Sequence, residues 1–318
     1  MPVGEKELIS RIRRQVGTRR GIIVGIGDDC AVLRLPPGHE ALVTTDFSLE
    51  GIHFRREWHP PESIGLRCLT RGLSDIAAMG GLPIAAFLSL ALPRKIPQSW
   101  VAKFIKGLLA LAEACNVTLS GGDTAESPVG VLADIVVIGS VPKGKAILRS
   151  TAREGDDIYV TDELGGSAAA LKLLFQGAKV LPRNFPRHFH PIPRLAIGQR
   201  LREKGWASAM IDTSDGLSTD LAHICEKSGV GAELHAAAIP RARVGKPPRE
   251  VDLNLSLHGG EDYELLFTAS PKKRLPTQIA GVPVKKIGRI IRGKRMLLVD
   301  EEGLKCELKS GGWQHFSR

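Results

Sequence analysis

Residues 61–92 read PESIGLRCLTRGLSDIAAMGGLPIAAFLSLAL, and this stretch decides the fold. In its first part, Pro61–Met79, apolar residues such as Leu69 and Ile76 recur at helical spacing, which predicts a helix with one buried face. The run Ile84–Leu92 is short and apolar and follows a Gly-Gly-Leu-Pro turn, as is typical of a buried strand. A long helix followed directly by a buried strand indicates a layered sheet-and-helix domain.

The same alternation continues on both sides of that stretch. Gln98–Asn116, introduced by Pro97, has the spacing of a second buried helix, and Gly130–Ser140 contains the strand-like run Ala133–Ile138. The second half of the chain repeats this pattern. The other expected elements are helices over 1–20, 167–175, 194–204 and 218–228, strands over 21–27, 41–45, 117–120, 157–161, 209–211, 263–269 and 285–291, and a loop over 182–193.

Between the two halves the composition turns polar and basic, over Pro142–Asp156. A chain of 318 residues is long enough for two domains. We therefore predict a boundary near residue 148, with one domain over 1–148 and the other over 149–318. A near match to a P-loop at Gly139–Ala146 is dismissed, because Ala146 lacks the hydroxyl that binds magnesium and Pro142 lacks a backbone N–H.

Composition excludes several classes of protein. Apolar residues make up 43% and charged residues 25% of the chain, as in a globular protein. No apolar run approaches the roughly 18 residues of a membrane helix, and Met1–Ser10 lacks the apolar core of a signal peptide. Five cysteines lie scattered singly, which argues against a disulfide framework or a zinc site and predicts a cytoplasmic protein.

The net charge of +10 is compatible with a nucleic-acid, membrane-surface or phosphorylated small-molecule partner. Aromatic residues amount to only 5%, which leaves few platforms on which bases of a single strand could stack. A solvated basic surface explains the charge best, and a basic nucleic-acid-binding protein is kept as an alternative from another class. The arginines within residues 11–20 have no assigned role.

Six short motifs combine acidic residues, mostly aspartates, with Gly, Ser or Thr, and most lie where an apolar run ends. One such motif is typical of turns and helix caps, but six together favour a functional site. Oxygen ligands without His or Cys suit Mg²⁺, and glycines let backbone N–H groups approach an anion. The motifs are Gly25–Asp29, Thr44–Asp46, Leu73–Asp75, Gly121–Thr124, Ile211–Gly216 and Gly259–Asp262.

These motifs, with Glu50-Gly-Ile-His53-Phe, Arg149-Ser and Gly-Trp313-Gln-His-Phe, resemble the thiamine-monophosphate kinase family in order and spacing from about residue 20 onward. That family lies in the superfamily of aminoimidazole ribonucleotide synthetase, whose PurM-like fold binds ATP without a P-loop. The resemblance implies an N-terminal α/β domain, residues 1–148, that binds ATP and metal and closes a β-barrel across a homodimer. It implies a C-terminal α+β domain, residues 149–318, that completes the site.

The resemblance further implies direct in-line transfer of the γ-phosphoryl group from ATP to thiamine monophosphate, with several Mg²⁺ ions and no acid–base residue. Asp28 is adjacent to the implied metal ligands, and we expect it to orient the loop through an Asx turn. The implied metal ligands are Asp29, Thr44, Thr45, Asp46, Asp75, Asp123, Asp212 and Asp215. The implied ATP contacts are Gly122, Asp123, Arg149 and Ser214, and the implied contacts to the thiamine phosphate are His53, Glu261 and Trp313.

Relatives within the superfamily use other acceptors, so a different acceptor is the alternative to thiamine monophosphate. Selenophosphate synthetase is expected to carry a reactive Cys or selenocysteine near its start, whereas no Cys precedes Cys30 here. The hydrogenase-maturation member is expected to end in Cys, whereas this chain ends in Arg318. We therefore expect ATP and thiamine monophosphate as the reactants, a homodimer, and neither a nucleic-acid nor a membrane partner.

Overall fold

The computed structural model describes residues 4–17 and 21–316, so parts of the expected N-terminal helix, including Arg19 and Arg20, lie outside the described residues. The chain forms two compact units. The N-terminal unit contains the described residues up to Ile76 and Gly81–Lys145, and the C-terminal unit contains Ala77–Gly80 and the described residues from Ala146 onward. The predicted assignment of ATP binding and dimerisation to residues 1–148 stays a prediction.

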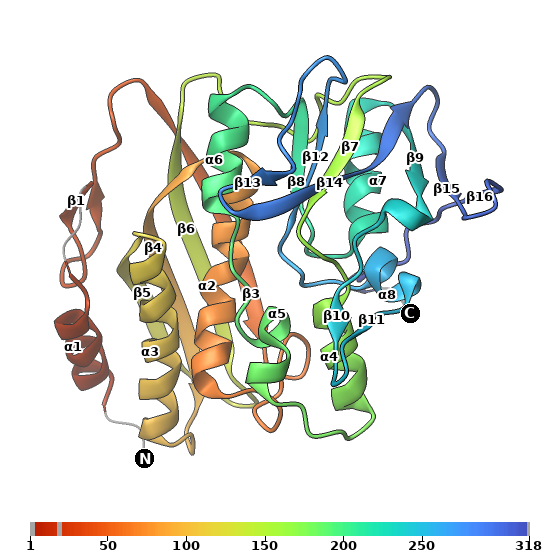
Figure 1. Ribbon diagram of the computed structural model, residues 1–318. Coiled ribbons are helices and arrows are strands. Elements are labelled where there is room, and N and C mark those ends of the chain that lie inside the picture. The colour runs from red at the N-terminus through yellow and green to blue at the C-terminus, as the bar shows by residue number, and fades with distance from the viewer. Residues whose placement is uncertain (1–3, 18–20, 317–318) are drawn as a thin grey trace. The chain divides into compact units, whose positions relative to one another are not determined.

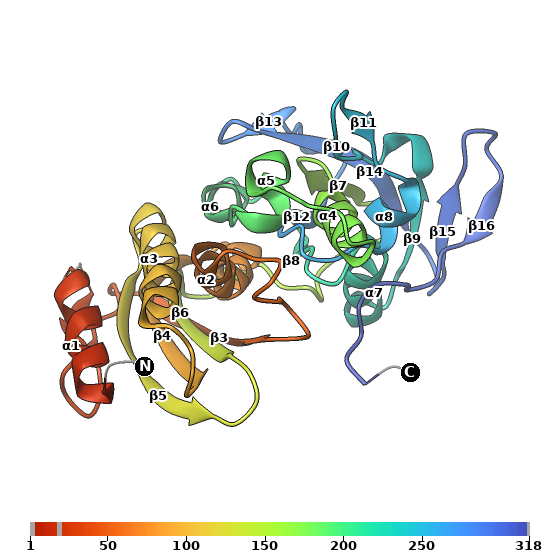
Figure 2. The same ribbon diagram turned by 90° about the horizontal axis from the view of Figure 1, so that it is seen from below.

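A four-stranded sheet in the order β3-β6-β4-β5 forms the centre of the N-terminal unit, and α2 and α3 cover one of its faces (Figure 2). The β4–β5 pair is parallel and the other pairs are antiparallel. The elements are α1 (Glu5–Gln15), β1 (Ile22–Val24), β2 (Val32–Leu33), β3 (His39–Leu49), α2 (Pro61–Ala78), β4 (Leu82–Pro93), α3 (Gln98–Ala114), β5 (Thr118–Ser127) and β6 (Leu132–Pro142).

The helices and the strand expected within residues 61–116 are confirmed as α2, β4 and α3. Two strands are longer than expected, because β3 continues to Leu49 and β5 continues to Ser127. Thr44–Asp46 and Gly121–Thr124 therefore lie inside strands rather than in loops at strand ends. The apolar runs stop earlier than the strands do because the strands continue with polar residues, of which Asp46 and Ser48 of β3 lie on the helix-covered face.

The two faces of the sheet differ sharply in exposure. Leu42, Val137 and Ala86 are buried on the face that α2 and α3 cover. On the opposite face the side chains of Val43 and Phe47 are 65% and 56% exposed. A strand with one buried and one open face normally carries polar residues on the open side, so exposed apolar residues there indicate a surface for another molecule.

The helices α2 and α3 pack through two glycines. A Cβ atom at Gly65 of α2 would lie 2.0 Å from the carbonyl oxygen of Phe104, and one at Gly107 of α3 would lie 1.9 Å from that of Glu62. Both distances are far below van der Waals contact, so the backbones approach too closely for any side chain. This contact holds α2, and with it Asp75, against the rest of the unit.

A mixed sheet in the order β16-β15-β9-β14-β7-β12-β8, with β13 beside β14, forms the C-terminal unit (Figure 1). Only the β9–β15 pair is parallel among the described strands of this sheet. The strands are β7 (Asp157–Thr161), β8 (Ala209–Asp212), β9 (Gly231–His235), β12 (Leu265–Ala269), β13 (Gln278–Ile279), β14 (Val282–Ile291), β15 (Met296–Val299) and β16 (Lys305–Glu307). The helices are α4 (Gly166–Phe175), α5 (Pro186–Phe189), α6 (Leu195–Glu203), α7 (Leu217–Ser228) and α8 (Leu253–His258), and β10 (Arg243–Val244) and β11 (Arg249–Glu250) form a hairpin.

The core of this unit lies between α7 and the sheet. Leu221 and Ile224 of α7 pack in one buried cluster with Val160, Ile211 and Leu266 of the central strands. The expected helices over 167–175, 194–204 and 218–228 are confirmed as α4, α6 and α7. The segment expected to be a loop over 182–193 contains the short helix α5. In the described part of the chain no helix is long and apolar enough to cross a membrane.

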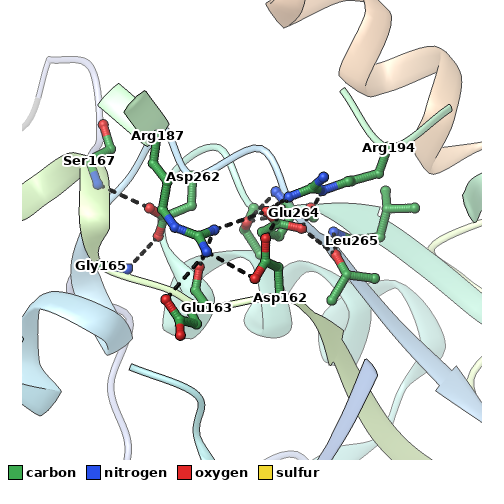
Figure 3. Close-up of polar contacts among 11 residues, drawn as sticks. Asp162, Glu163, Gly165, Ser167, Arg187, Arg194, Asp262, Glu264 and Leu265 are labelled. Carbon is green, nitrogen blue, oxygen red and sulfur yellow. Dashed lines mark hydrogen bonds and ion pairs between the residues drawn. The ribbon is translucent and has the colours of Figure 1, made fainter. Parts of the chain in front are cut away.

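Buried charges connect the strands and helices of the C-terminal unit (Figure 3). Glu264 is 1% exposed and accepts hydrogen bonds from Thr161 Oγ1 at 2.6 Å and from Arg194 Nε at 2.7 Å. Burial raises the pKa of Glu264, and the contacts with Arg194 and Thr161 oppose that rise. Arg194 and Arg187 also both pair with Asp162, so two cations are shared among the three carboxylates of Asp162, Glu163 and Glu264.

Asp262 is a second buried carboxyl, and it binds the start of α4. It accepts hydrogen bonds from the backbone N–H groups of Gly165 at 2.6 Å and Ser167 at 3.2 Å (Figure 3). Burial raises the pKa of Asp262 to about 7, and the two N–H donors oppose that shift. The carboxyl therefore supplies from a distant loop the cap that α4 lacks in its own sequence.

We predict that Gly107→Ala lowers the free energy of unfolding by about 1–3 kcal/mol, because overpacking outweighs the better helix propensity of Ala. Urea denaturation followed by circular dichroism measures the change. Lys106→Ala is the matched control, since Lys106 is exposed one position earlier on the same helix. A Gly107→Ala protein as stable as the Lys106→Ala protein would contradict the close contact.

We predict that stability falls as pH rises from about 4 to 7 in part because of Asp262. The folded protein holds a proton on this carboxyl up to about pH 7, whereas the unfolded chain releases it near 3.8. Asp262→Asn removes that titration. The free energy of unfolding of the variant should therefore fall less steeply with rising pH than that of the wild type, by up to about 1.4 kcal/mol per pH unit. Denaturation curves at several pH values measure this, with Asp252→Asn at the exposed cap of α8 as control. Parallel pH profiles for wild type and Asp262→Asn would refute the prediction.

Candidate active site

Two carboxyls and a hydroxyl meet on the helix-covered face of the N-terminal sheet. Thr44 and Asp46 point to this face from β3, and Thr44 Oγ1 donates a hydrogen bond to Asp75 Oδ2 of α2. Burial and the charge of Asp75 raise the pKa of Asp46 to about 7, while Arg71 lowers it. Asp46 Oδ2 is buried and has no hydrogen-bond partner among the described residues.

A third carboxyl, Asp134, was missed by the sequence analysis. It lies on β6 and accepts a hydrogen bond from Thr45 Oγ1 at 2.8 Å, and its charge also raises the pKa of Asp46. Strand register places Asp134 opposite Ser89 of β4, which in turn lies opposite Asp123 of β5. Since Asp134 also lies opposite Phe47, Asp134 and Asp123 point to the open face of the sheet and not to the helix-covered face of Thr44 and Asp46. The available signal was a single charge within the apolar run Ala133–Ile138.

The donor chemistry around Asp46 fits Mg²⁺. Within residues 4–17 and 21–316 no group of three or more His, Cys, Asp and Glu side chains is arranged to hold a metal ion. Carboxylate and hydroxyl oxygens from β3 and α2 nevertheless converge, and Asp46 contributes a buried oxygen without a partner. Mg²⁺ commonly takes only one or two protein carboxylates and completes its shell with water and substrate phosphates. The residues present therefore suit an ion that arrives with its substrate.

Other predicted residues of the N-terminal unit are more dispersed. Gly122 and Asp123 lie on β5, three strands from β3, and a Cβ at Gly122 would lie 1.9 Å from the carbonyl oxygen of Leu88. Asp28 and Asp29 are exposed in the connection between β1 and β2, where Asp28 Oδ1 accepts the N–H of Asp29 at 2.9 Å.

His53 lies in the turn that follows β3. Its ring nitrogen Nδ1 accepts a hydrogen bond from the backbone N–H of Leu49 at 3.0 Å. The backbone N–H of His53 in turn donates to the Leu49 carbonyl at 2.9 Å. An accepting Nδ1 leaves the proton of the neutral ring on Nε2. The turn thus fixes both the position and the tautomer of this side chain.

In the C-terminal unit, the loop after β8 pairs with the loop before β12. Glu261 N–H donates to the Ser214 carbonyl at 2.8 Å, and Tyr263 N–H donates to the Thr213 carbonyl at 2.9 Å. Glu261 and Tyr263 adopt left-handed backbone angles, with φ of 65° and 53°. Such angles are unfavourable for these residue types and mark a tightly constrained loop. The pairing brings the predicted residues Ser214 and Glu261 together.

Asp220 is a buried carboxyl that the sequence analysis also missed. It accepts hydrogen bonds from the backbone N–H groups of Asp215 at 3.2 Å and Gly216 at 3.0 Å. Burial and the nearby charges of Asp212 and Asp215 raise its pKa well above the ordinary value. Asp220 therefore holds the predicted metal-binding loop in shape from within α7.

The predicted residue Trp313 lies beside this loop, whereas Arg149 does not. Trp313 N–H donates to the Asp215 carbonyl at 3.0 Å, and its side chain is 52% exposed. The carbonyl of Arg149 instead accepts a hydrogen bond from Ser228, at the far end of α7. A helix of 12 residues is about 18 Å long, so the Arg149 backbone is remote from Asp215.

Each unit thus presents a group of acidic side chains held by rigid elements. The carboxylates with raised pKa values are suited to divalent cations, and the glycines allow a phosphate to approach the backbone closely. The exposed aromatic ring is suited to an aromatic part of the ligand. Such an arrangement favours phosphoryl transfer over acid–base or covalent chemistry. The nearby contact between Ser218 Oγ and Nδ1 of His258, at 2.8 Å, offers no accessible nucleophile, because Ser218 is fully buried.

Comparison with known proteins agrees with this assignment. The model of the AIR synthase related protein N-terminal domain matches residues 27–141, and that of the C-terminal domain matches residues 153–300. The thiamine-monophosphate kinase of Salmonella typhimurium is 37% identical and covers 100% of this chain and 99% of its own. The enzyme of Bacillus subtilis with the same name is 34% identical, covering 98% of this chain and 99% of its own.

Solved structures show the same fold over nearly the full length. A thiamine-monophosphate kinase from Stenotrophomonas maltophilia K279a superposes with a TM-score of 0.82 at 36% identity, covering 94% of this chain and 97% of its own. ThiL complexed with AMPPCP and TMP gives 0.77 at 30% identity, covering 99% of both chains. The hydrogenase maturation protein HypE, at 18% identity and a TM-score of 0.79, shares the fold alone. On these full-length matches, the chain belongs to the thiamine-monophosphate kinase family.

Proposed function

We propose that this chain transfers the γ-phosphoryl group of ATP directly to the phosphate of thiamine monophosphate, which yields thiamine diphosphate. Family membership over the full length supports the reaction class, and a relative is known as a complex with AMPPCP and TMP. The observation that carries the proposal for this chain is the buried, unpartnered Asp46 oxygen beside Asp75, since it calls for a cation that accompanies phosphates.

Both reactants are polyanions, so the main physical task is to bring like charges together. We assign Mg²⁺ binding to carboxyls and hydroxyls of both units. When bound, Mg²⁺ neutralises phosphate oxygens and the charge that develops in the transition state. The proposed ligands are Asp29, Thr44, Thr45, Asp46, Asp75, Asp123, Asp212 and Asp215, of which Asp46 must lose its proton to act.

The remaining contacts divide between the two reactants. Gly122, Asp123, Arg149 and Ser214 are assigned to ATP. Arg149 is suited to phosphate because its planar guanidinium can donate two parallel hydrogen bonds. A phosphate oxygen of thiamine monophosphate is already a nucleophile, so we assign no general base.

The thiamine part of the acceptor is assigned to His53, Glu261 and Trp313. The exposed indole of Trp313 offers a face to the cationic thiazolium ring, and Glu261 offers a carboxylate to the same charge. These residues distinguish thiamine monophosphate from the acceptors of other members of the superfamily.

We also propose that the chain forms a homodimer through the open face of the N-terminal sheet. Val43 and Phe47 of β3 are exposed there beside the half-buried Phe87 and Val136 of neighbouring strands. A second copy of this face would bury these side chains, and the result would be the barrel that the family resemblance implies.

We predict that Asp75→Asn lowers kcat/KM by about 100-fold or more, because it removes a charge from the proposed metal site. The amide oxygen can still accept the hydrogen bond of Thr44, so the fold should persist. Chromatography of thiamine diphosphate formed from ATP, Mg²⁺ and thiamine monophosphate measures the rate, with EDTA as a second control. Glu113→Gln, on the exposed side of α3, should act like wild type. Wild-type protein that binds ATP but forms no thiamine diphosphate would refute the assigned acceptor.

We predict that Val43→Lys converts the dimer to a monomer, because a buried charge opposes association of the two sheet faces. Sedimentation velocity measures the molecular mass. Val129→Lys is the matched control, since Val129 is 89% exposed outside the sheet. The Val129→Lys protein should therefore remain a dimer. A monomeric wild type, or a dimer unaffected by Val43→Lys, would exclude this interface.

A further inference from the structure

The segment Gly311–Trp313 is held against the first turn of α7 by its backbone. Three consecutive N–H groups donate hydrogen bonds to residues within or just before that turn. The pairs are Gly311 N–H to Ser218 Oγ at 3.2 Å, Gly312 N–H to Thr219 Oγ1 at 3.0 Å and Trp313 N–H to the Asp215 carbonyl at 3.0 Å. Three bonds in succession fix the segment's path, although it belongs to no helix or strand.

The two glycines are required by how closely this segment lies on α7. A Cβ atom at Gly312 would lie 2.0 Å from the Asp215 carbonyl oxygen and 2.7 Å from Thr219 Oγ1. One at Gly311 would lie 2.7 Å from Nδ1 of His258. At Gly312 the obstacle is backbone, so any other residue would displace the segment, whereas a side chain at Gly311 would have to move the ring of His258.

The acceptors of the segment are themselves fixed. Ser218 and Thr219 are buried, at 0% and 3% exposure. Ser218 Oγ lies 2.8 Å from Nδ1 of His258, which ends α8 immediately before the loop of Glu261. Trp313, in contrast, is 52% exposed as a residue, and its ring contacts the ring of His315 edge to face. A rigid backbone therefore carries an accessible aromatic ring.

We propose that Gly311–Trp313 is a latch that positions the Trp313 ring beside the Asp215 loop, and that Ser218, Thr219 and the two glycines are positioning residues for the thiamine substrate. This inference rests on the proposed function, because it takes Trp313 as a contact to thiamine monophosphate. The latch joins the last residues of the described chain to the loop assigned to metal. It explains why a ring on a segment without secondary structure can be held ready for a ligand.

A positioning role makes a selective kinetic prediction. Gly312→Ala and Thr219→Val should each raise the KM for thiamine monophosphate about tenfold, as expected when one ring contact is lost, with the KM for ATP unchanged within about twofold. Thr219→Val keeps the volume of the side chain and removes only the hydroxyl acceptor. Gly17→Ala is the matched control, because nothing lies within 4 Å of its Cβ position.

A double-mutant cycle tests whether the latch acts through the ring. In a Trp313→Ala background, Thr219→Val should cause no further rise in the KM for thiamine monophosphate, since the ring that it positions is gone. Additive effects would overturn the proposal. So would an equal rise of both KM values, which would indicate a general structural role for Thr219.

A ¹⁹F NMR measurement, which does not depend on enzyme activity, tests the latch independently of the proposed function. The protein contains four Trp residues, and 5-fluorotryptophan labelling with Trp313→Phe as the assignment variant identifies the ¹⁹F signal of Trp313. Thr219→Val should move the ¹⁹F chemical shift of Trp313 towards that of free 5-fluorotryptophan and narrow the line. The signals of the other three Trp residues should stay unchanged. An unchanged Trp313 signal would overturn the latch. Failure of the wild type to make thiamine diphosphate would instead remove the assigned substrate while the latch stands.

Discussion

The enforced proximity of Asp46 and Asp75 is the constraint on which the N-terminal site depends. β3 supplies one carboxyl and α2 the other, and the glycine contact between α2 and α3 fixes the second. Burial and mutual repulsion disfavour the charged form of Asp46, so its pKa rises to about 7. The charge of Arg71 opposes this rise, and in the proposed site a divalent ion would relieve the repulsion further. In the proposed site, the geometry that disfavours the charged form of Asp46 in the free protein therefore favours binding of a metal–phosphate complex.

Buried acids in this chain divide into two kinds by their hydrogen-bond partners. Asp262 and Glu264 have strong internal donors, namely backbone N–H groups for the first and Arg194 for the second. These acids connect elements of the C-terminal unit and need no ligand. Asp46 is different, because one of its oxygens has no partner among the described residues. An unpaired buried polar atom is expensive, and the proposed metal site rests on this one because it lies beside a second carboxyl, Asp75.

The sequence predicted the helices well because their apolar spacing extends over several turns, as in α2 and α3. Strand ends were predicted less well, since β3 continues through the polar residues Asp46 and Ser48 and β5 through Asp123 and Glu126. Sequence also does not distinguish the roles of neighbouring acids. In the segment Gly259–Glu264, the three acids Glu261, Asp262 and Glu264 look alike in sequence. Only long-range contacts separate them, as Asp262 binds α4 and Glu264 binds Arg194. Asp134 and Asp220 were missed for this reason too, since their partners are set by strand register and by a neighbouring loop.

The motif glycines of the C-terminal unit allow backbone segments of the proposed site to contact one another directly. A Cβ at Gly260 would lie 2.6 Å from the Ser214 carbonyl oxygen, and one at Gly216 would lie 2.8 Å from the backbone of His258. The loop after β8, the loop before β12 and the segment Gly311–Trp313 thus touch through main-chain atoms. Main-chain contacts are stiffer than contacts between long side chains, because little rotamer freedom is left to absorb a displacement. The three segments therefore behave as one assembly, and the identity of their side chains can serve ligand binding instead of packing.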